Sequence, residues 1–313
     1  MKNLSINKNN IYSNVNILIV CVTVLYIFLA ILFYNTISNF NGTFLQLFVL
    51  IIISVFVIRV INFVKGNIVK AVLQSSFVFI FFAYFFGVTS KFQLLLTHHW
   101  MDANLITFDK AVFGMELSLR LQSLVNPYLT EAMMFAYVFY IPLLLIAGFS
   151  AYKGTGSKGL SEYLFVLSLG YIFCYVGFTL FPVASQMYFM PEKYIVPLKG
   201  GLFTSLSELI RNHLHFKGGS LPSPHCAAAT IILWACYKYN KKIFFVILPS
   251  IFLLYISTVY GRFHYCMDSA IGILTGYIAI LIHPLIIKLI DLIKIFFNSI
   301  LHPVSISNSL SEE

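Results

Sequence analysis

Charged side chains are scarce in this sequence. Asp, Glu, Lys and Arg make up 10% of its 313 residues, whereas a soluble protein carries about 25%. Hydrophobic residues account for 59%, and the mean hydropathy is +0.88. This composition excludes an ordinary soluble domain and predicts a protein that lies largely in a lipid bilayer.

Other absences narrow the function. The five cysteines show no Cys-x-x-Cys spacing, so neither a redox motif nor a disulfide framework is expected. The histidine pairs His98-His99 and His213-x-His215 lack accompanying Cys or Glu ligands. We therefore expect no metal site and no cofactor. The net charge of +9 reflects cations that flank membrane spans, and no nucleic-acid partner is expected.

The sequence contains eight apolar runs whose length is near or above the roughly 18 residues needed to span a bilayer. The first run is too long for a signal peptide and lacks a small-residue cleavage site. The sixth is the shortest and begins with Pro224, which suits a first helical turn. We predict an all-α polytopic membrane protein with about eight transmembrane helices, at residues 15–36, 44–64, 68–88, 132–151, 160–183, 224–240, 243–260 and 269–287.

The cations are unevenly distributed among the connections. If the N-terminus is cytoplasmic, twelve of the twenty Lys and Arg residues fall in cytoplasmic tails and short turns. The other eight lie in the segments 89–131, 184–223 and 261–268, which would face outward. The positive-inside rule therefore places both termini on the cytoplasmic side of the membrane. We expect that membrane to be a plasma or inner membrane. The segment 89–131 has helical spacing and is expected to hold one or two interfacial helices.

Two polar segments stand at the ends of apolar runs, residues 222–225 (PSPH) and 260–268 (YGRFHYCMD). Ionisable groups at span ends cost desolvation free energy unless they are partnered, so they are functional candidates. The sixth and seventh spans are antiparallel because a tight basic turn joins them. His225, His264 and Asp268 are therefore predicted to share the extracytoplasmic face.

These three side chains suit phosphoryl transfer. His264 and Asp268 are four residues apart and lie on one face of a helix that begins there. A carboxylate bonded to one ring nitrogen fixes the tautomer and leaves the other nitrogen free to attack. His225 on the adjoining span can protonate the departing oxygen. A structural polar network at the span ends is the alternative.

Both polar segments resemble signatures of the type 2 phosphatidic acid phosphatase (PAP2) superfamily. Residues 222–225 are similar to its Pro-Ser-x-His signature, and residues 257–268 to its Ser-Arg-x5-His-x3-Asp signature. The variant Thr-Val-Tyr-x-Arg-x-His-Tyr at 258–265 is closer to the inositolphosphotransferase-like branch, which includes inositol phosphorylceramide synthases. Residues 102–114 (DANLITFDKAVFG) and 180–182 (LFP) are also similar to that branch.

The resemblance implies a role for each matching residue. His264 is the nucleophile that becomes phosphorylated, Asp268 orients it, and His225 is the acid for the leaving group. Ser223 helps to hold the phosphate. The implied arrangement has an N-terminal tail and two to three leading spans at 1–88, a six-helix PAP2-like catalytic core with interfacial outer loops at 89–287, and a cytoplasmic tail at 288–313.

The sequence departs from the family pattern in its cations. The Lys-x6-Arg-Pro signature is absent, and Thr258 stands where the third signature has arginine. Phosphoryl transfer needs positive charge against the equatorial oxygens, so other residues must supply it. Arg262 is the best candidate for phosphate binding, and Lys217, Lys199 and Arg211 are weaker ones.

The predicted function is a membrane lipid phosphoesterase or phosphotransferase that acts on a phospholipid or sphingolipid at the extracytoplasmic face. A hydroxyl acceptor would make it a head-group transferase, whereas water would make it a lipid phosphate phosphatase. The alternative from another class is a non-enzymatic lipid transporter or lipid-binding protein. A transporter would carry charged or broken positions at mid-membrane depth, whereas here the ionisable groups stand at span ends. The oligomeric state is left open.

Overall fold

The computed structural model describes residues 11–301, which form helices and connections without a strand. Seven of the described helices are long and apolar enough to cross a membrane. This confirms an all-α, multi-pass membrane protein. The seven are α1 (Ser13–Leu32), α2 (Phe40–Phe63), α3 (Asn67–Thr89), α6 (Pro127–Thr155), α7 (Ser157–Leu180), α11 (Lys241–Tyr260) and α12 (Cys266–Leu301).

The sixth predicted span forms as helix α10 (Pro224–Tyr239) but is short. Its 16 residues extend about 24 Å at 1.5 Å per residue, less than the roughly 30 Å of a bilayer core. α10 packs against α6, α7, α11 and α12, and so lies at the centre of the bundle. Its surface is built from small residues such as Ala227, Ala228 and Ala229, which are all buried.

Two glycines of α12 allow this helix to approach α10 closely. A Cβ added at Gly272 would lie 2.5 Å from the Ser223 carbonyl oxygen, and one at Gly276 would lie 2.6 Å from the Ala227 oxygen. Small residues are the usual means of bringing two membrane helices into backbone contact. The packing places the first turn of α12 beside the first turn of α10.

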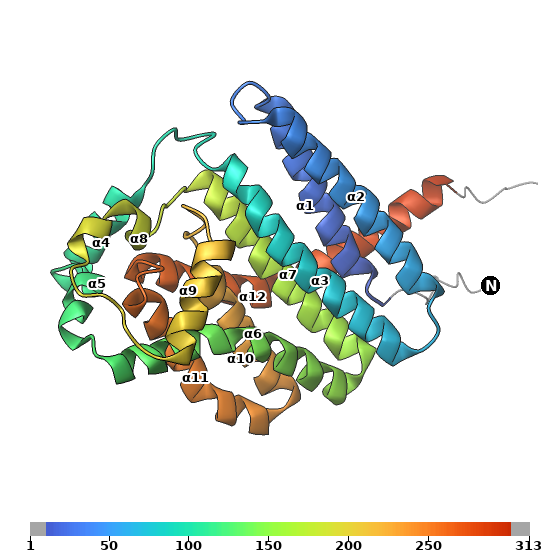
Figure 1. Cartoon of the computed structure of the whole chain (residues 1–313). Helices are drawn as coiled ribbons and strands as arrows, with labels where there is room; N and C mark the ends of the chain where they lie inside the picture. Colours follow the sequence, from blue (N-terminus) through green and yellow to red (C-terminus); the bar gives the residue numbers. More distant parts are fainter. Residues whose placement is uncertain (1–10, 302–313) are drawn as a thin grey trace, which may run out of the picture.

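Short helices gather at one end of the bundle (Figure 1). The start of α1 and the last turns of α12 lie at the opposite end, where Lys294 Nζ donates to Asn14 Oδ1. The segment 89–131 was expected to hold one or two helices. It contains two α-helices, α4 and α5. The short elements are η1 (Ser90–Phe92), α4 (Asp102–Phe113), α5 (Leu117–Arg120), η2 (Leu121–Leu124), α8 (Gln186–Phe189), η3 (Pro191–Lys193) and α9 (Leu202–Leu214).

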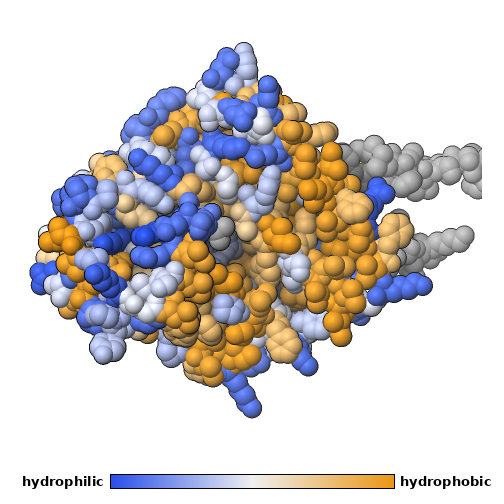
Figure 2. All heavy atoms as spheres, viewed as in Figure 1, coloured by the Kyte–Doolittle hydropathy of each residue, from blue (hydrophilic) through white to orange (hydrophobic). Residues whose placement is uncertain are grey.

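The surface follows the same division. Figure 2 shows apolar residues over the flank formed by the long helices and hydrophilic residues over the end that carries α4, α5 and α8. Large side chains of α2 face outward, with Phe56 66% and Phe63 83% exposed. Apolar side chains at such positions suit contact with lipid chains.

The last helix is longer than the span predicted for it. α12 continues to Leu301 instead of ending near 287, because Leu289, Ile290 and Ile293 maintain an apolar helical pattern past Pro284. The first part of the predicted tail 288–313 is therefore helical. The remainder of that tail, at 302–313, and the start of the N-terminal tail, at 1–10, lie outside the described residues.

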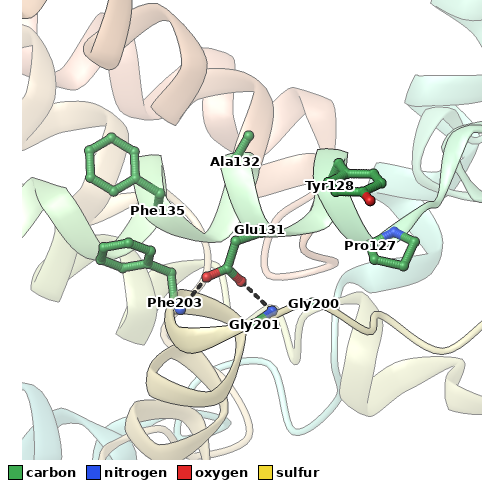
Figure 3. A pocket seen from close by; sticks show the side chains of 8 residues that line it. All are labelled: Pro127, Tyr128, Glu131, Ala132, Phe135, Gly200, Gly201 and Phe203. Carbon is green, nitrogen blue, oxygen red and sulfur yellow. Dashed lines mark hydrogen bonds between the residues drawn. The ribbon is translucent and has the colours of Figure 1, made fainter.

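Glu131 on α6 holds the start of α9. Its Oε1 accepts a hydrogen bond from Phe203 N at 2.7 Å, and its Oε2 accepts from Gly201 N at 2.7 Å and from Thr204 N at 3.1 Å; Figure 3 shows two of these bonds. The N-cap residue of α9 makes no side-chain cap of its own. Glu131 therefore satisfies N–H groups that would otherwise lack a partner.

We expect Glu131→Gln to loosen α9. An amide offers one acceptor oxygen instead of two, and loss of a helix cap costs about 0.5–2 kcal/mol. Hydrogen exchange of residues 202–214 in detergent micelles should become faster, and Tm should fall. Glu208→Gln on the exposed surface of α9 is the matched control and should change stability by less than about 0.5 kcal/mol. Equal exchange rates in the two variants would contradict the capping role.

Candidate active site

His264, Asp268 and Ser220 form a buried hydrogen-bonded group. His264 lies in the connection between α11 and α12, and Asp268 lies in the first turn of α12. His264 Nδ1 is 3.2 Å from Asp268 Oδ2 and 3.1 Å from Ser220 Oγ. Ser220 Oγ also donates to Asp268 Oδ2. Asp268 is fully buried and His264 is 4% exposed.

These contacts determine where the His264 proton lies. A carboxylate oxygen only accepts, so the nitrogen that faces Asp268 must carry the hydrogen. Nδ1 is therefore protonated in the neutral ring, and Nε2 keeps its lone pair. An imidazole in this tautomer is a nucleophile whose direction is fixed by its neighbours. The sequence predicted the partnership of His264 with Asp268 but not the part played by Ser220.

His225 approaches His264 from the start of α10. The two rings have centroids 5.8 Å apart and are nearly edge to face. The rings of Tyr137 and Tyr140 on α6 pack against His225 at 4.8 and 5.1 Å. His225 Nδ1 is buried and has no hydrogen-bond partner within residues 11–301. The three predicted catalytic side chains thus meet at one end of the bundle.

The histidines line a small cavity. Its volume is about 20 Å³, which is room for about one water molecule. The backbone at Gly218 and Gly219 adopts φ of +115° and +66°, values that glycine accommodates without strain. Among the described residues, those that line the cavity include no Lys, Arg, Asp or Glu. Its polar walls are His215, His225, His264, Ser185, Ser220, Tyr188, Gly218 and Gly219.

Like Ser220, His215 lines the cavity and was not predicted as a site residue from the sequence. It directly follows α9, and its ring stacks on that of His225 with centroids 6.4 Å apart. Its Nε2 lies 3.4 Å from the Tyr137 hydroxyl. Burial, helped by the nearby His264 and Arg211, lowers the pKa of His215 to about 4. The ring is therefore neutral at pH 7.

The three predicted phosphate-binding residues lie outside the cavity wall. Ser223 is fully buried, and its Oγ caps α10 by accepting from Cys226 N at 3.4 Å. Arg262 Nη2 donates to the Val196 carbonyl. Its guanidinium stacks over the ring of Tyr194, 4.4 Å from the ring centre. Lys217 is exposed, with its ammonium 5.4 Å from the centre of the Trp100 ring.

Two carboxylates of α4 hold the segment that carries His264. Asp102 is fully buried and accepts from the Tyr265 hydroxyl at 2.9 Å and from Ala184 N at 2.8 Å. Asp109 accepts from Cys266 N and Met267 N at 3.0 and 3.1 Å, and so caps α12 from another helix. Burial raises the pKa of both carboxyl groups. Asp102 and Asp109 are seven residues apart and so lie on one face of α4. That spacing is the sequence feature from which their shared role could have been predicted.

A larger hollow lies elsewhere. It has a volume of about 560 Å³ between α6 and the start of α9, lined by residues such as Phe135, Phe203 and Tyr128 (Figure 3). Its carboxylate is Glu131, whose oxygens already accept hydrogen bonds from α9, and its other titratable group is the phenol of Tyr128. It holds no histidine, and so lacks the pair of imidazoles that the smaller cavity contains. Within the described part of the chain, no group of three His, Cys, Asp or Glu side chains is placed to hold a metal ion.

The lowered pKa of His215 makes folding sensitive to acid. Between pH 6.5 and 4 the unfolded chain binds a proton that the folded chain does not, so stability falls as the pH falls. We expect the Tm of the wild type in micelles to drop more steeply from pH 6.5 to 4.5 than that of His215→Gln. His213→Gln, at an exposed position two residues earlier, should keep the wild-type slope. A His215→Gln slope equal to the wild type would contradict the assignment.

The sequence was also compared with known protein families. A family model described as the PAP2 superfamily matches residues 103–282, more than half of the chain. The matched segment contains the three cavity histidines together with Ser220 and Asp268. Searches of curated proteins and of solved structures gave no significant match. The chain belongs to the PAP2 superfamily.

Proposed function

We propose that this protein is an integral membrane lipid phosphoesterase or phosphotransferase that works through a phosphohistidine at His264. Membership of the PAP2 superfamily supports a phosphatase-type lipid phosphoesterase. The observation that carries the finer proposal is the hydrogen-bonded group Ser220–Asp268–His264 with His225 facing it across one cavity. Asp268 and Ser220 are positioning residues, and the two histidines are catalytic.

The first step transfers the phosphoryl group to the enzyme. His264 Nε2 attacks phosphorus, so a P–N bond forms while the P–O bond to the leaving group breaks. The departing oxygen takes a proton from the imidazolium of His225, which the negative charge of the bound phosphate stabilises. The Asp268 carboxylate stabilises the positive charge that develops on His264, because its oxygen accepts the Nδ1–H bond at 3.2 Å.

The second step releases the phosphoryl group. His225, now neutral, removes the proton from an acceptor hydroxyl, whose oxygen attacks phosphorus. The P–N bond breaks, and both histidines return to their starting states. A lipid or sugar hydroxyl as acceptor gives head-group transfer, which the similarity of 102–114 and 258–265 to the inositolphosphotransferase-like branch supports. Water as acceptor gives a lipid phosphate phosphatase.

The phosphate must also be held while this chemistry proceeds. The N-terminus of α10 opens onto the cavity at Pro224 and His225, and helix N-termini favour anions. Ser223 would support this end through its cap. Arg262 and Lys217 remain predicted phosphate ligands, and their side chains have to turn toward the cavity when a substrate binds.

The two histidines should be required for turnover. We expect His264→Ala to abolish the release or transfer of phosphate from a panel of phospholipid and sphingolipid phosphoesters in mixed micelles. His225→Ala should lower kcat by about 10²–10⁴-fold, the usual contribution of a general acid. His213→Ala, which changes an exposed histidine, is the matched control and should retain activity. Full activity in both site variants would contradict the mechanism and favour lipid binding or transport.

The site is proposed to face away from the cytoplasm, with both termini on the cytoplasmic side. Two exposed lysines at opposite ends of the bundle test this, Lys199 in the loop before α9 and Lys241 at the start of α11. A membrane-impermeant maleimide on intact cells should label Lys199→Cys above the parent protein. It should label Lys241→Cys only after permeabilisation. The reverse pattern would place the site in the cytoplasm.

A further inference from the structure

We propose that His215, as an imidazolium, is a further cation that binds the substrate phosphate, and the one that the cavity wall itself supplies. The inference rests on the proposed function and adds the group that balances the charge of the phosphate. The starting observation is the composition of the cavity wall, where the described residues supply three imidazoles and neither lysine nor arginine. Phosphoryl transfer without positive charge against the equatorial oxygens would be slow.

The three histidines have different surroundings, which suggests different roles. His264 is fixed by Asp268 and Ser220, so it is arranged to attack. His225 opens α10 and faces His264 at 5.8 Å, so it is arranged to transfer a proton. His215 has no carboxylate partner among the described residues and does not open a helix. Its ring stacks on that of His225 and lies beside the Tyr137 hydroxyl. It is the imidazole left to hold the anion.

Aromatic neighbours keep the His215 ring at the cavity wall. The centroid of Phe263 lies 5.8 Å from it and that of Phe86 lies 6.2 Å from it. Of its two ring nitrogens, Nε2 is the one with a hydrogen-bond partner among residues 11–301, the hydroxyl of Tyr137. An imidazolium at this position would therefore have a ring N–H to donate to a phosphate oxygen.

The charges around His215 favour this use. The titratable groups that face it are Tyr137 on α6, Tyr188 on α8, Arg211 on α9, His225 on α10 and His264 before α12. None is a carboxylate, so nothing in the empty cavity stabilises a cation there. An arriving phosphate brings negative charge into contact with the ring and raises its pKa. Phosphate binding is then coupled to proton uptake, and affinity should rise as the pH falls.

A histidine has an advantage over a fixed cation in such an enclosed space. A lysine or arginine in the empty cavity would keep a charge that burial disfavours. His215 is neutral until the anion enters, because its pKa in the empty cavity is about 4. A charge then appears in this small cavity, of about 20 Å³, only when the phosphate enters.

Binding of inorganic phosphate to the full chain in detergent micelles tests the proposal. Calorimetry at pH 6, 7 and 8, in buffers of different ionisation enthalpy, gives both affinity and proton uptake. We expect His215→Gln, which keeps a polar side chain without a titratable group, to bind phosphate at least about tenfold more weakly and to take up about one proton fewer. His215→Lys should restore affinity and hold it toward pH 8. His213→Gln should behave as the wild type.

Turnover of a short-chain lipid phosphate in the same micelles separates this inference from the proposed function. His215→Gln should raise KM at least about tenfold and change kcat less, whereas His264→Ala should abolish kcat. If His215→Gln keeps wild-type affinity, proton uptake and KM while His264→Ala is inactive, His215 is not the phosphate cation and the proposed function still stands. A wild type that neither binds phosphate nor cleaves the ester overturns both.

Discussion

The buried carboxylate of Asp268 is the constraint around which this end of the molecule is organised. A buried carboxylate needs hydrogen-bond donors, and here His264 and Ser220, from two different connections, both donate to Oδ2, while Oδ1 has no partner among the described residues. The same contacts select the His264 tautomer and direct its free nitrogen into the cavity. The stability of the fold and the reactivity of the site thus depend on the same hydrogen bonds.

Helix packing brings those donors together. Gly272 and Gly276 let α12 reach the backbone of α10, so that Asp268 and His225 stand at neighbouring helix ends. From the outside, Asp102 and Asp109 of α4 tie the connection before α12 in place. Glu131 does the same for α9, which leads directly into His215. Carboxylates on α4 and α6 therefore hold the segments that lead into His264 and His215.

Much of this arrangement could be predicted from the sequence, because hydropathy and loop charge determine which helix ends meet. That argument brought His225, His264 and Asp268 together, and four-residue spacing paired the last two. The same argument could not predict the positions of Ser220 and His215, because they lie in an irregular connection with long-range contacts. Ser220, for example, is 48 residues from Asp268 in the sequence. Nor did the sequence reveal that Arg262, at a φ of +66°, directs its guanidinium to Val196.

The most direct measurement is the chemical state of His264 during turnover. Protein quenched in alkali, where phosphoramidates survive, can be digested and its phosphorylated residue located by mass spectrometry. The mechanism predicts phosphate on the His264 imidazole in wild-type protein exposed to a lipid phosphoester, and a greater amount when the acceptor is withheld. Turnover with the phosphate on another residue, or with no phosphorylated residue at all, would contradict it.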